Sequence, residues 1–157
     1  MAIERVRAYF RQWDMEQRIQ EFAVSSATVE LAAEALGCEG KRIAKSLSLQ
    51  DGDGAVLVVA AGDARIDNHK FKEAFGFKPK MLKPDQVEPR IGHAIGGVCP
   101  FAVSADVPVY LDVSMRRFAT VFPACGSANS AIELTIAELE KYSQAEKWVD
   151  VCKAWQQ

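Results

Sequence analysis

The chain contains 157 residues, of which 49% are hydrophobic and 25% charged, and its formal net charge is −2 at pH 7. This length fits one domain over residues 1–157 with an ordinary core. The charge argues against a uniformly basic nucleic-acid binder, and we expect no DNA partner. No apolar run approaches the ~20 residues that span a bilayer, and the N-terminus lacks the apolar stretch of a signal peptide. We therefore expect a cytoplasmic protein without membrane contact.

Two helices and a hairpin are predicted in the first third of the chain. Hydrophobic residues spaced by three and four predict a helix over residues 3–13 and a second over 28–36, which ends at Gly37. Apolar runs over 43–49 and 55–60 predict two strands. The Asp-Gly-Asp-Gly sequence between them is typical of a tight hairpin turn.

Helices and strands alternate in the rest of the chain. We predict helices over 68–75, with Asp67 as its N-cap, and over 85–91. Strands are predicted over 109–113 and 118–122.

The C-terminal part carries the clearest local signature. Thr135-Ile-Ala-Glu138 is a capping box that begins a helix, and residues 147–151 form a last short strand. Because helices and strands alternate but include a hairpin, we predict an α/β or α+β domain built on a mixed sheet.

Four cysteines lie far apart, at positions 38, 99, 125 and 152. They form no Cys-x-x-Cys pair and no cysteine–histidine cluster with the spacing of a zinc site. We expect free thiols and no metal.

Lys45 interrupts the apolar pattern of its strand. Because side chains alternate between the two faces, Lys45 shares one face with Ile43, Leu47 and Leu49. Lysine is rarely buried without a partner. We expect Lys45 either to line a cavity or to point its ammonium at an anion. If the strand begins near Lys45, the alternative is an amine that reaches water along the edge of the core.

The segment Gly-His-Ala-Ile-Gly-Gly-Val-Cys-Pro-Phe, residues 92–101, combines glycines with a proline. Glycine lets the backbone approach another group, and Pro100 restricts its own φ and the residue before it. A rigid loop with bare amides results, and such amides bind the oxygen of a polarised carbonyl, a carboxylate or a phosphate. The alternative is a plain turn.

His93 and Cys99 lie in the same segment and suggest a thiol hydrolase as a further alternative. In that mechanism a base activates the thiolate while the loop amides hold the oxyanion. A small cysteine beside a proline is more often part of the packing, however. We expect Cys99 to be replaceable.

Two other segments are candidates for ligand contact. The small and polar run 124–130 is either a plain connection or one wall of a small pocket opposite the glycines. Between residues 68 and 90 the chain has six basic and three acidic residues, which makes this segment +3 and the remainder −5. Such a local basic surface fits contact with one end of an RNA, and the alternative is a solvated lysine-rich face. The candidate contacts are Lys78, Lys80 and Lys83.

Three motifs together resemble the YbaK/EbsC family, which includes the editing domain inserted in bacterial prolyl-tRNA synthetase and its freestanding relatives. They are Ile-Ala-Lys-Ser-Leu around Lys45, Gly-Gly-Val-Cys-Pro-Phe from Gly96, and Ala-Ile-Glu-Leu from Ala131. The likeness extends from about Val24 to Val151. It implies a curved or barrel-like, mostly antiparallel mixed sheet surrounded by helices.

The resemblance also implies an activity: hydrolysis, without a cofactor, of the ester that joins a wrong amino acid to tRNA, often tRNA(Pro), with prolyl-tRNA synthetase as a candidate partner. It assigns substrate holding to Lys45 and the oxyanion site to Gly96 and Gly97. Substrate contacts are expected from the remainder of the two loops, at Val98, Cys99, Pro100, Cys125, Gly126, Ser127 and Asn129. The chemistry in this family looks substrate-assisted, which agrees with the missing base.

One departure bears on the substrate. The segment before Ile-Glu-Leu reads Cys-Gly-Ser-Ala-Asn-Ser-Ala here, where cysteinyl-tRNA deacylases of the family tend to have Gly-Gly-Lys-Arg-Gly-Leu-Asp. Ala131 replaces the polar aspartate. An alanyl, seryl, threonyl or non-protein aminoacyl group is therefore as good a candidate as a cysteinyl group. The competing function is a tRNA- or nucleotide-binding accessory module that has the pocket but no turnover.

Overall fold

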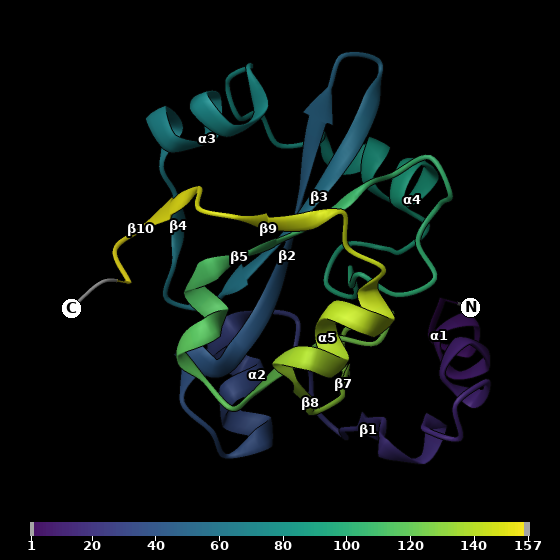
Figure 1. The fold of residues 1–157 in the computed structure, drawn as a ribbon. Coiled ribbons are helices and arrows are strands. Elements are labelled where there is room, and N and C mark those ends of the chain that lie inside the picture. The colour runs from purple at the N-terminus through teal and green to yellow at the C-terminus, as the bar shows by residue number, and fades with distance from the viewer. Residues whose placement is uncertain (1, 156–157) are drawn as a thin grey trace.

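The computed structural model describes residues 2–155 (Figure 1). The α-helices are α1 (Ala2–Arg11), α2 (Val29–Leu36), α3 (Asn68–Phe75), α4 (Pro84–Ile91) and α5 (Ile136–Ser143), and short 3₁₀ helices cover Glu16–Arg18, Gly40–Arg42 and Val113–Arg117. The longer strands are β2 (Ile43–Asp51), β3 (Gly54–Ala61), β5 (Val109–Asp112), β6 (Thr120–Pro123) and β9 (Lys147–Val149). The two-residue strands are β1 (Gln20–Glu21), β4 (Arg65–Ile66), β7 (Ser130–Ala131), β8 (Leu134–Thr135) and β10 (Cys152–Lys153).

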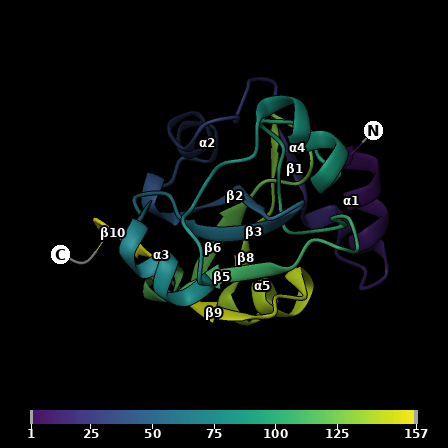
Figure 2. The same cartoon turned by 90° about the horizontal axis from the view of Figure 1, so that it is seen from above.

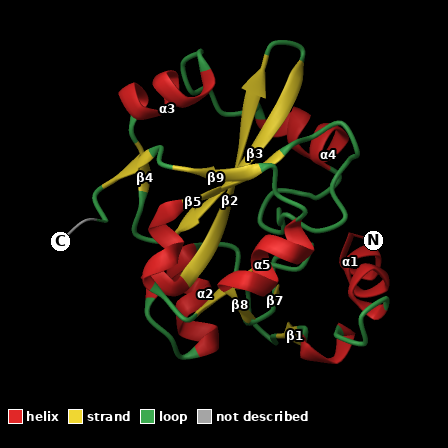
Figure 3. Cartoon of the chain, in the orientation of Figure 1, coloured by secondary structure: helices red, strands yellow, loops and turns green. Residues whose placement is uncertain are grey.

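A six-stranded mixed sheet forms the centre of the molecule, in the order β8-β6-β2-β3-β5-β9. The antiparallel β2–β3 ladder is its longest pairing, whereas β2–β6, β3–β5 and β5–β9 are short parallel pairings. Helices lie between the strands in the chain and surround this sheet (Figure 3). Seen from above, α2 and α4 lie on one side of the β2–β3 hairpin and α5 on the other (Figure 2). The predicted mixed, curved architecture is confirmed.

The local signals in the sequence are found where they were predicted. Asp51 pairs with Gly54 across the hairpin turn, and Gly52 adopts φ +58°. The Asp67 carboxylate accepts the amides of residues 69 and 70 at 3.0 Å and caps α3. The capping box of Thr135 begins α5 as predicted.

The start of β6 and the end of β9 each differ by two residues from the predicted strands, and one buried carboxylate explains both. The side chain of Asp112 accepts a hydrogen bond from the amide of Ser114, and the chain continues as a 3₁₀ helix. Strand β6 therefore begins only at Thr120. The same carboxylate accepts the amide of Val151, so that β9 ends at Val149.

Helix α1 packs against the core through Ile3, Val6 and Phe10. The Phe10 ring contacts that of Phe101 at 4.7 Å between centroids, so α1 supports the end of the glycine-containing loop. None of the helices in the described residues is long and apolar enough to cross a membrane.

Candidate functional site

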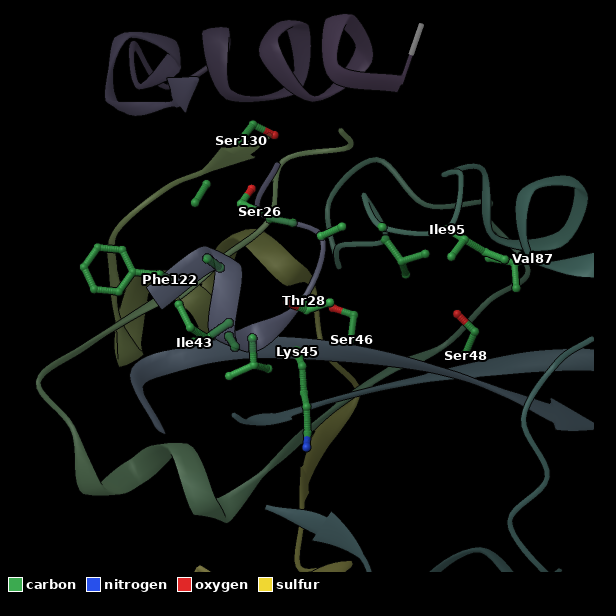
Figure 4. Close-up of a pocket in the computed structure, with 18 of the residues that line it drawn as sticks. Ser26, Thr28, Ile43, Lys45, Ser46, Ser48, Val87, Ile95, Phe122 and Ser130 are labelled. Carbon is green, nitrogen blue, oxygen red and sulfur yellow. The ribbon is translucent and has the colours of Figure 1, made fainter. Parts of the chain in front are cut away.

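A cavity of about 300 Å³ opens beside strand β2 (Figure 4). Its walls come from five segments that are distant in the sequence: residues 26–32, 43–48, 81–87, 95–98 and 122–131. The fold therefore brings Lys45, the glycine loop (residues 92–101) and the two ends of the small-residue loop (residues 124–131) to one cavity.

Five of the described residues that line this cavity have hydroxyl groups, and the rest of the lining is mainly apolar. The hydroxyl-bearing residues are Ser26, Thr28, Ser46, Ser48 and Ser130, and the larger apolar ones include Val29, Ile43, Met81, Leu82, Val87, Ile95, Val98 and Phe122. Over residues 2–155, no carboxylate or imidazole lines the cavity. A reaction here must therefore use water, backbone amides, Lys45 or a group of the ligand itself.

Lys45 lines the cavity, but its ammonium points away from Ser46 and Ser48 (Figure 4). Its Nζ donates to the carbonyl of Ala64 and, at 3.4 Å, to that of Gly62. Burial lowers the pKa of Lys45, and the two carbonyls replace part of its lost hydration. The sequence left open whether this ammonium lines a cavity, meets an anion or reaches water, and the structure shows it bound by carbonyls of the turn after β3.

The glycine loop meets the cavity through Gly96, which has φ +92°, and through Val98. Among the described residues neither of their amides donates to a protein acceptor. The Gly97 amide, by contrast, donates to the carbonyl of Ala94 at 3.0 Å. In this structure Gly97 is therefore not the bare donor that the sequence predicted.

Gly97 serves instead to bring the glycine loop and the small-residue loop into contact. A Cβ at Gly97 would lie 2.6 Å from the Ser127 nitrogen and 2.7 Å from the carbonyl carbon of Gly126. Glycine is required because only a residue without a side chain allows this approach. Of the two alternatives that the sequence left open for residues 124–130, the structure therefore shows the one in which this loop lies opposite the glycines.

Cys99 and Pro100 are buried behind the cavity rather than in its wall. The Cys99 sulfur lies 3.5 Å from His93 Nε2, while Nε2 itself lies 2.7 Å from the carbonyl of Phe101 and donates its proton there. Burial raises the pKa of the Cys99 thiol to about 12 and lowers the pKa of His93. A thiolate is therefore disfavoured, and the geometry contradicts the thiol hydrolase hypothesis.

The small-residue loop contributes its ends to the cavity and not its middle. Ala124, Ser130 and Ala131 line the wall, whereas the predicted contacts Cys125, Gly126, Ser127 and Asn129 do not. The middle of the loop is held by its own hydrogen bonds. The Ser127 hydroxyl donates at 2.7 Å to that of Ser130, and the Asn129 amide donates at 3.0 Å to the carbonyl of Phe22.

Several lining residues were missed from the sequence. Ser26 and Thr28 precede α2, and Thr28 also caps this helix by accepting the amide of Leu31 at 3.1 Å. Ser46 and Ser48 belong to the face of β2 opposite Lys45. The period of two in β2 groups these serines together, but it does not say which face meets a cavity.

The three candidate RNA-contacting lysines are exposed on an extended segment beside the cavity. The carbonyl of Lys80 accepts the Gln50 amide at 2.8 Å, and the amide of Leu82 donates at 2.9 Å to the carbonyl of Ser48. These bonds attach the segment to β2, so Lys78, Lys80 and Lys83 flank the cavity-lining Met81 and Leu82.

The comparisons with known proteins agree with this geometry. The family model for the aminoacyl-tRNA editing domain matches residues 24–142, most of the chain and all five cavity segments. This chain belongs to that family. Its family membership agrees with the three motifs around Lys45, Gly96 and Ala131.

Relatives of this editing domain include freestanding proteins and parts of larger enzymes. YwhH of Bacillus subtilis, an uncharacterized protein, is 57% identical over 99% of this chain and 100% of its own length. EbsC of Enterococcus faecalis, named as a candidate Cys-tRNA(Pro)/Cys-tRNA(Cys) deacylase, is 31% identical over 73% of this chain and 72% of EbsC. A proline–tRNA ligase of Thermosipho melanesiensis is 30% identical over 79% of this chain, which is 22% of the ligase.

A solved structure shares the complete fold. It is described as a candidate trans-editing enzyme for prolyl-tRNA synthetase and superposes with a TM-score of 0.86 at 28% identity, over 97% of both chains.

Proposed function

We propose that this editing domain is a trans-acting hydrolase that cleaves the ester between a small amino acid and the 3′ end of tRNA(Pro). Residues 1–157 act as one unit in this proposal. The observation that carries it is the meeting of a glycine loop and an apolar cavity within a chain that matches the editing family over residues 24–142. The names of EbsC and of the solved trans-editing structure support the same reaction class.

The amides of Gly96 and Val98 form the proposed oxyanion site. A water oxygen adds to the ester carbonyl, whose oxygen gains negative charge as the tetrahedral intermediate forms. The bond to the ribose oxygen then breaks, and that oxygen takes up the proton released by the water. Because no carboxylate or imidazole among residues 2–155 lines the cavity, we assign proton transfer to a group of the aminoacyl-adenosine itself. No cofactor is required.

Lys45 is the proposed cation for the adenosine end of the substrate. Its ammonium is held by the carbonyls of Gly62 and Ala64, and it must leave at least one of them to meet a phosphate or ribose oxygen in the cavity. Substrate entry would provide the compensating charge and hydrogen bonds. The exposed Lys78, Lys80 and Lys83 then accompany the RNA strand that leaves the cavity.

The matches to proline–tRNA ligases support tRNA(Pro) as the carrier and prolyl-tRNA synthetase as a partner. A small, uncharged aminoacyl group fits the short side chains of Ala44, Ser46 and Ala124 in the wall.

The purified chain should be incubated with tRNA(Pro) charged separately with alanine, serine, threonine, cysteine, 2-aminobutyrate and proline, and release of the amino acid followed. We expect release of at least one small amino acid and none of proline. Binding of the charged tRNA without any release would overturn the hydrolase in favour of the alternative, a non-catalytic accessory module.

A further inference from the structure

The cavity contains a buried hydroxyl with nothing to bind. Ser46 Oγ is inaccessible to solvent and has no hydrogen-bond partner among the described residues. An unsatisfied polar group in a protein interior costs roughly 1–3 kcal/mol, so such groups are uncommon without a function. The Ser46 side chain belongs to the cavity wall, and a rotation about its χ1 would turn this hydroxyl into the space where a ligand binds.

A second hydroxyl lies on the same face of the strand. Ser48 is 5% exposed and also lines the cavity, two residues along β2. Its backbone carbonyl is already used by the amide of Leu82 at 2.9 Å, which fixes the strand at this position. Figure 4 shows both serine side chains on the cavity side of β2 and the Lys45 ammonium on the other side.

The surroundings of these two hydroxyls determine what they can recognise. Ala44, Leu82 and Val87 lie in the same wall and offer no hydrogen bond from their side chains. The charge of Lys45 is directed to the carbonyls of Gly62 and Ala64. A charged amino-acid side chain would find no counter-ion in this part of the cavity, whereas a neutral hydroxyl could both donate to and accept from serine.

We propose that Ser46, assisted by Ser48, is a specificity-determining residue that selects a small aminoacyl group bearing a hydroxyl over an equally large apolar one. This inference rests on the proposed function and adds the chemical class of the substrate side chain. A site that hydrogen-bonds a substrate hydroxyl rejects the analogue without it, because the protein group is then left unpaired. Size alone discriminates poorly between groups that differ by one methylene.

Seryl and 2-aminobutyryl esters of the same tRNA test this selection, since they differ by a hydroxyl in place of a methyl group. We expect kcat/KM for the seryl ester to exceed that of the 2-aminobutyryl ester by about tenfold or more. Ser46→Ala should reduce this ratio to near one, mainly by raising the rate on the 2-aminobutyryl ester. Ser46→Thr, which keeps the hydroxyl, should restore a ratio above one, and Ser48→Ala should lower it less than Ser46→Ala.

Ser143→Ala is the matched control, because it removes a buried serine hydroxyl in α5 whose one partner among residues 2–155 is the carbonyl of Glu140. It should leave the ratio unchanged. A wild-type ratio of one or less, or an unchanged ratio in Ser46→Ala, overturns the inference while the deacylase stands.

Loss of hydrolysis on every ester would instead contradict the proposed function. In that case the selectivity is tested by binding. The affinities of non-hydrolysable 3′-amide analogues of seryl- and 2-aminobutyryl-adenosine are measured by calorimetry. Tighter binding of the seryl analogue that Ser46→Ala abolishes would support selection by Ser46 in a binding module. Equal binding would overturn it.

Discussion

Strand β2 and the glycine loop each have a side that faces the cavity and a side that is fixed in the core, and the two sides differ in chemistry. On the cavity side lie the small Ser46 and Ser48, together with Gly96 and Val98, whose amides donate to no acceptor among the described residues. On the core side, Lys45 and His93 are bound by backbone carbonyls. The ionisable groups that the sequence suggested, Lys45 and His93, are therefore already hydrogen-bonded within the protein. The groups that remain for a ligand are hydroxyls and amides.

Gly97→Ala should have the largest effect, because it forces the two loops apart. The new Cβ would overlap backbone atoms of Gly126 and Ser127, which cannot move as a flexible side chain would. We expect a loss of about 1–3 kcal/mol in unfolding free energy and a fall of roughly 100-fold in deacylation, as the amides leave their positions. Denaturant unfolding and single-turnover hydrolysis measure the two effects.

Gly76→Ala is its control, since Gly76 at φ +83° has open space around it and lies at the end of α3. An alanine there is strained by ~1–2 kcal/mol without touching the cavity. If both variants lose the same activity, the Gly97 effect is one of stability and not of loop placement.

Lys45→Met separates anchoring from substrate contact on the core side of β2. Methionine keeps most of the stem but removes the charge that binds the carbonyls of Gly62 and Ala64. If the ammonium moves to the substrate, KM for the charged tRNA should rise by about tenfold with a smaller change in stability. An unchanged KM together with a lower melting temperature would show that Lys45 only anchors the turn.

The faces of β2 show where sequence reasoning succeeds and where it stops. The alternation of side chains in a strand predicted that Ser46 and Ser48 share one face and that Lys45 lies on the other. The glycine loop was predicted from its glycines and proline alone. The partners of Lys45 could not be predicted, because Ala64 reaches it only through the tertiary turn after β3. The same holds for Gly97, whose occupied amide depends on a turn with Ala94 that no residue pattern reveals.

The lysines at the rim of the cavity provide a smaller, salt-dependent test. Replacing Lys78, Lys80 and Lys83 together by glutamine should weaken tRNA binding several-fold at low salt and flatten the dependence of affinity on salt. The selectivity between different aminoacyl groups should not change, because these side chains are outside the cavity wall. The same replacement at Lys41, Lys141 and Lys147 is the control. Equal affinity in both triple variants at low salt would exclude the rim as an RNA contact.

His93 should make the core side of the glycine loop sensitive to acid. Burial lowers the pKa of His93 in the folded protein, so the unfolded chain binds its proton at higher pH. The contribution of neutral His93 to the free energy of unfolding is therefore fully present above the unfolded pKa of about 6.5. It is lost as the pH falls toward the lower pKa of the folded protein. His93→Gln should flatten this part of the unfolding profile.

Cys99→Ser should have the smallest effect on activity and thereby tests the contrast between the two sides most directly. The thiol is fully buried with a pKa near 12, and its sulfur lies 3.7 Å from the carbonyl of Phe101. A serine hydroxyl can donate to the same carbonyl, so we expect kcat/KM to change by less than about twofold with a modest loss of stability. Treatment of the native protein with iodoacetamide should leave Cys99 unmodified, which mass spectrometry can check. Hydrolysis should also be unchanged by this treatment. Abolished hydrolysis in a folded Cys99→Ser variant would place the nucleophile on the core side and reverse the assignment of the two sides.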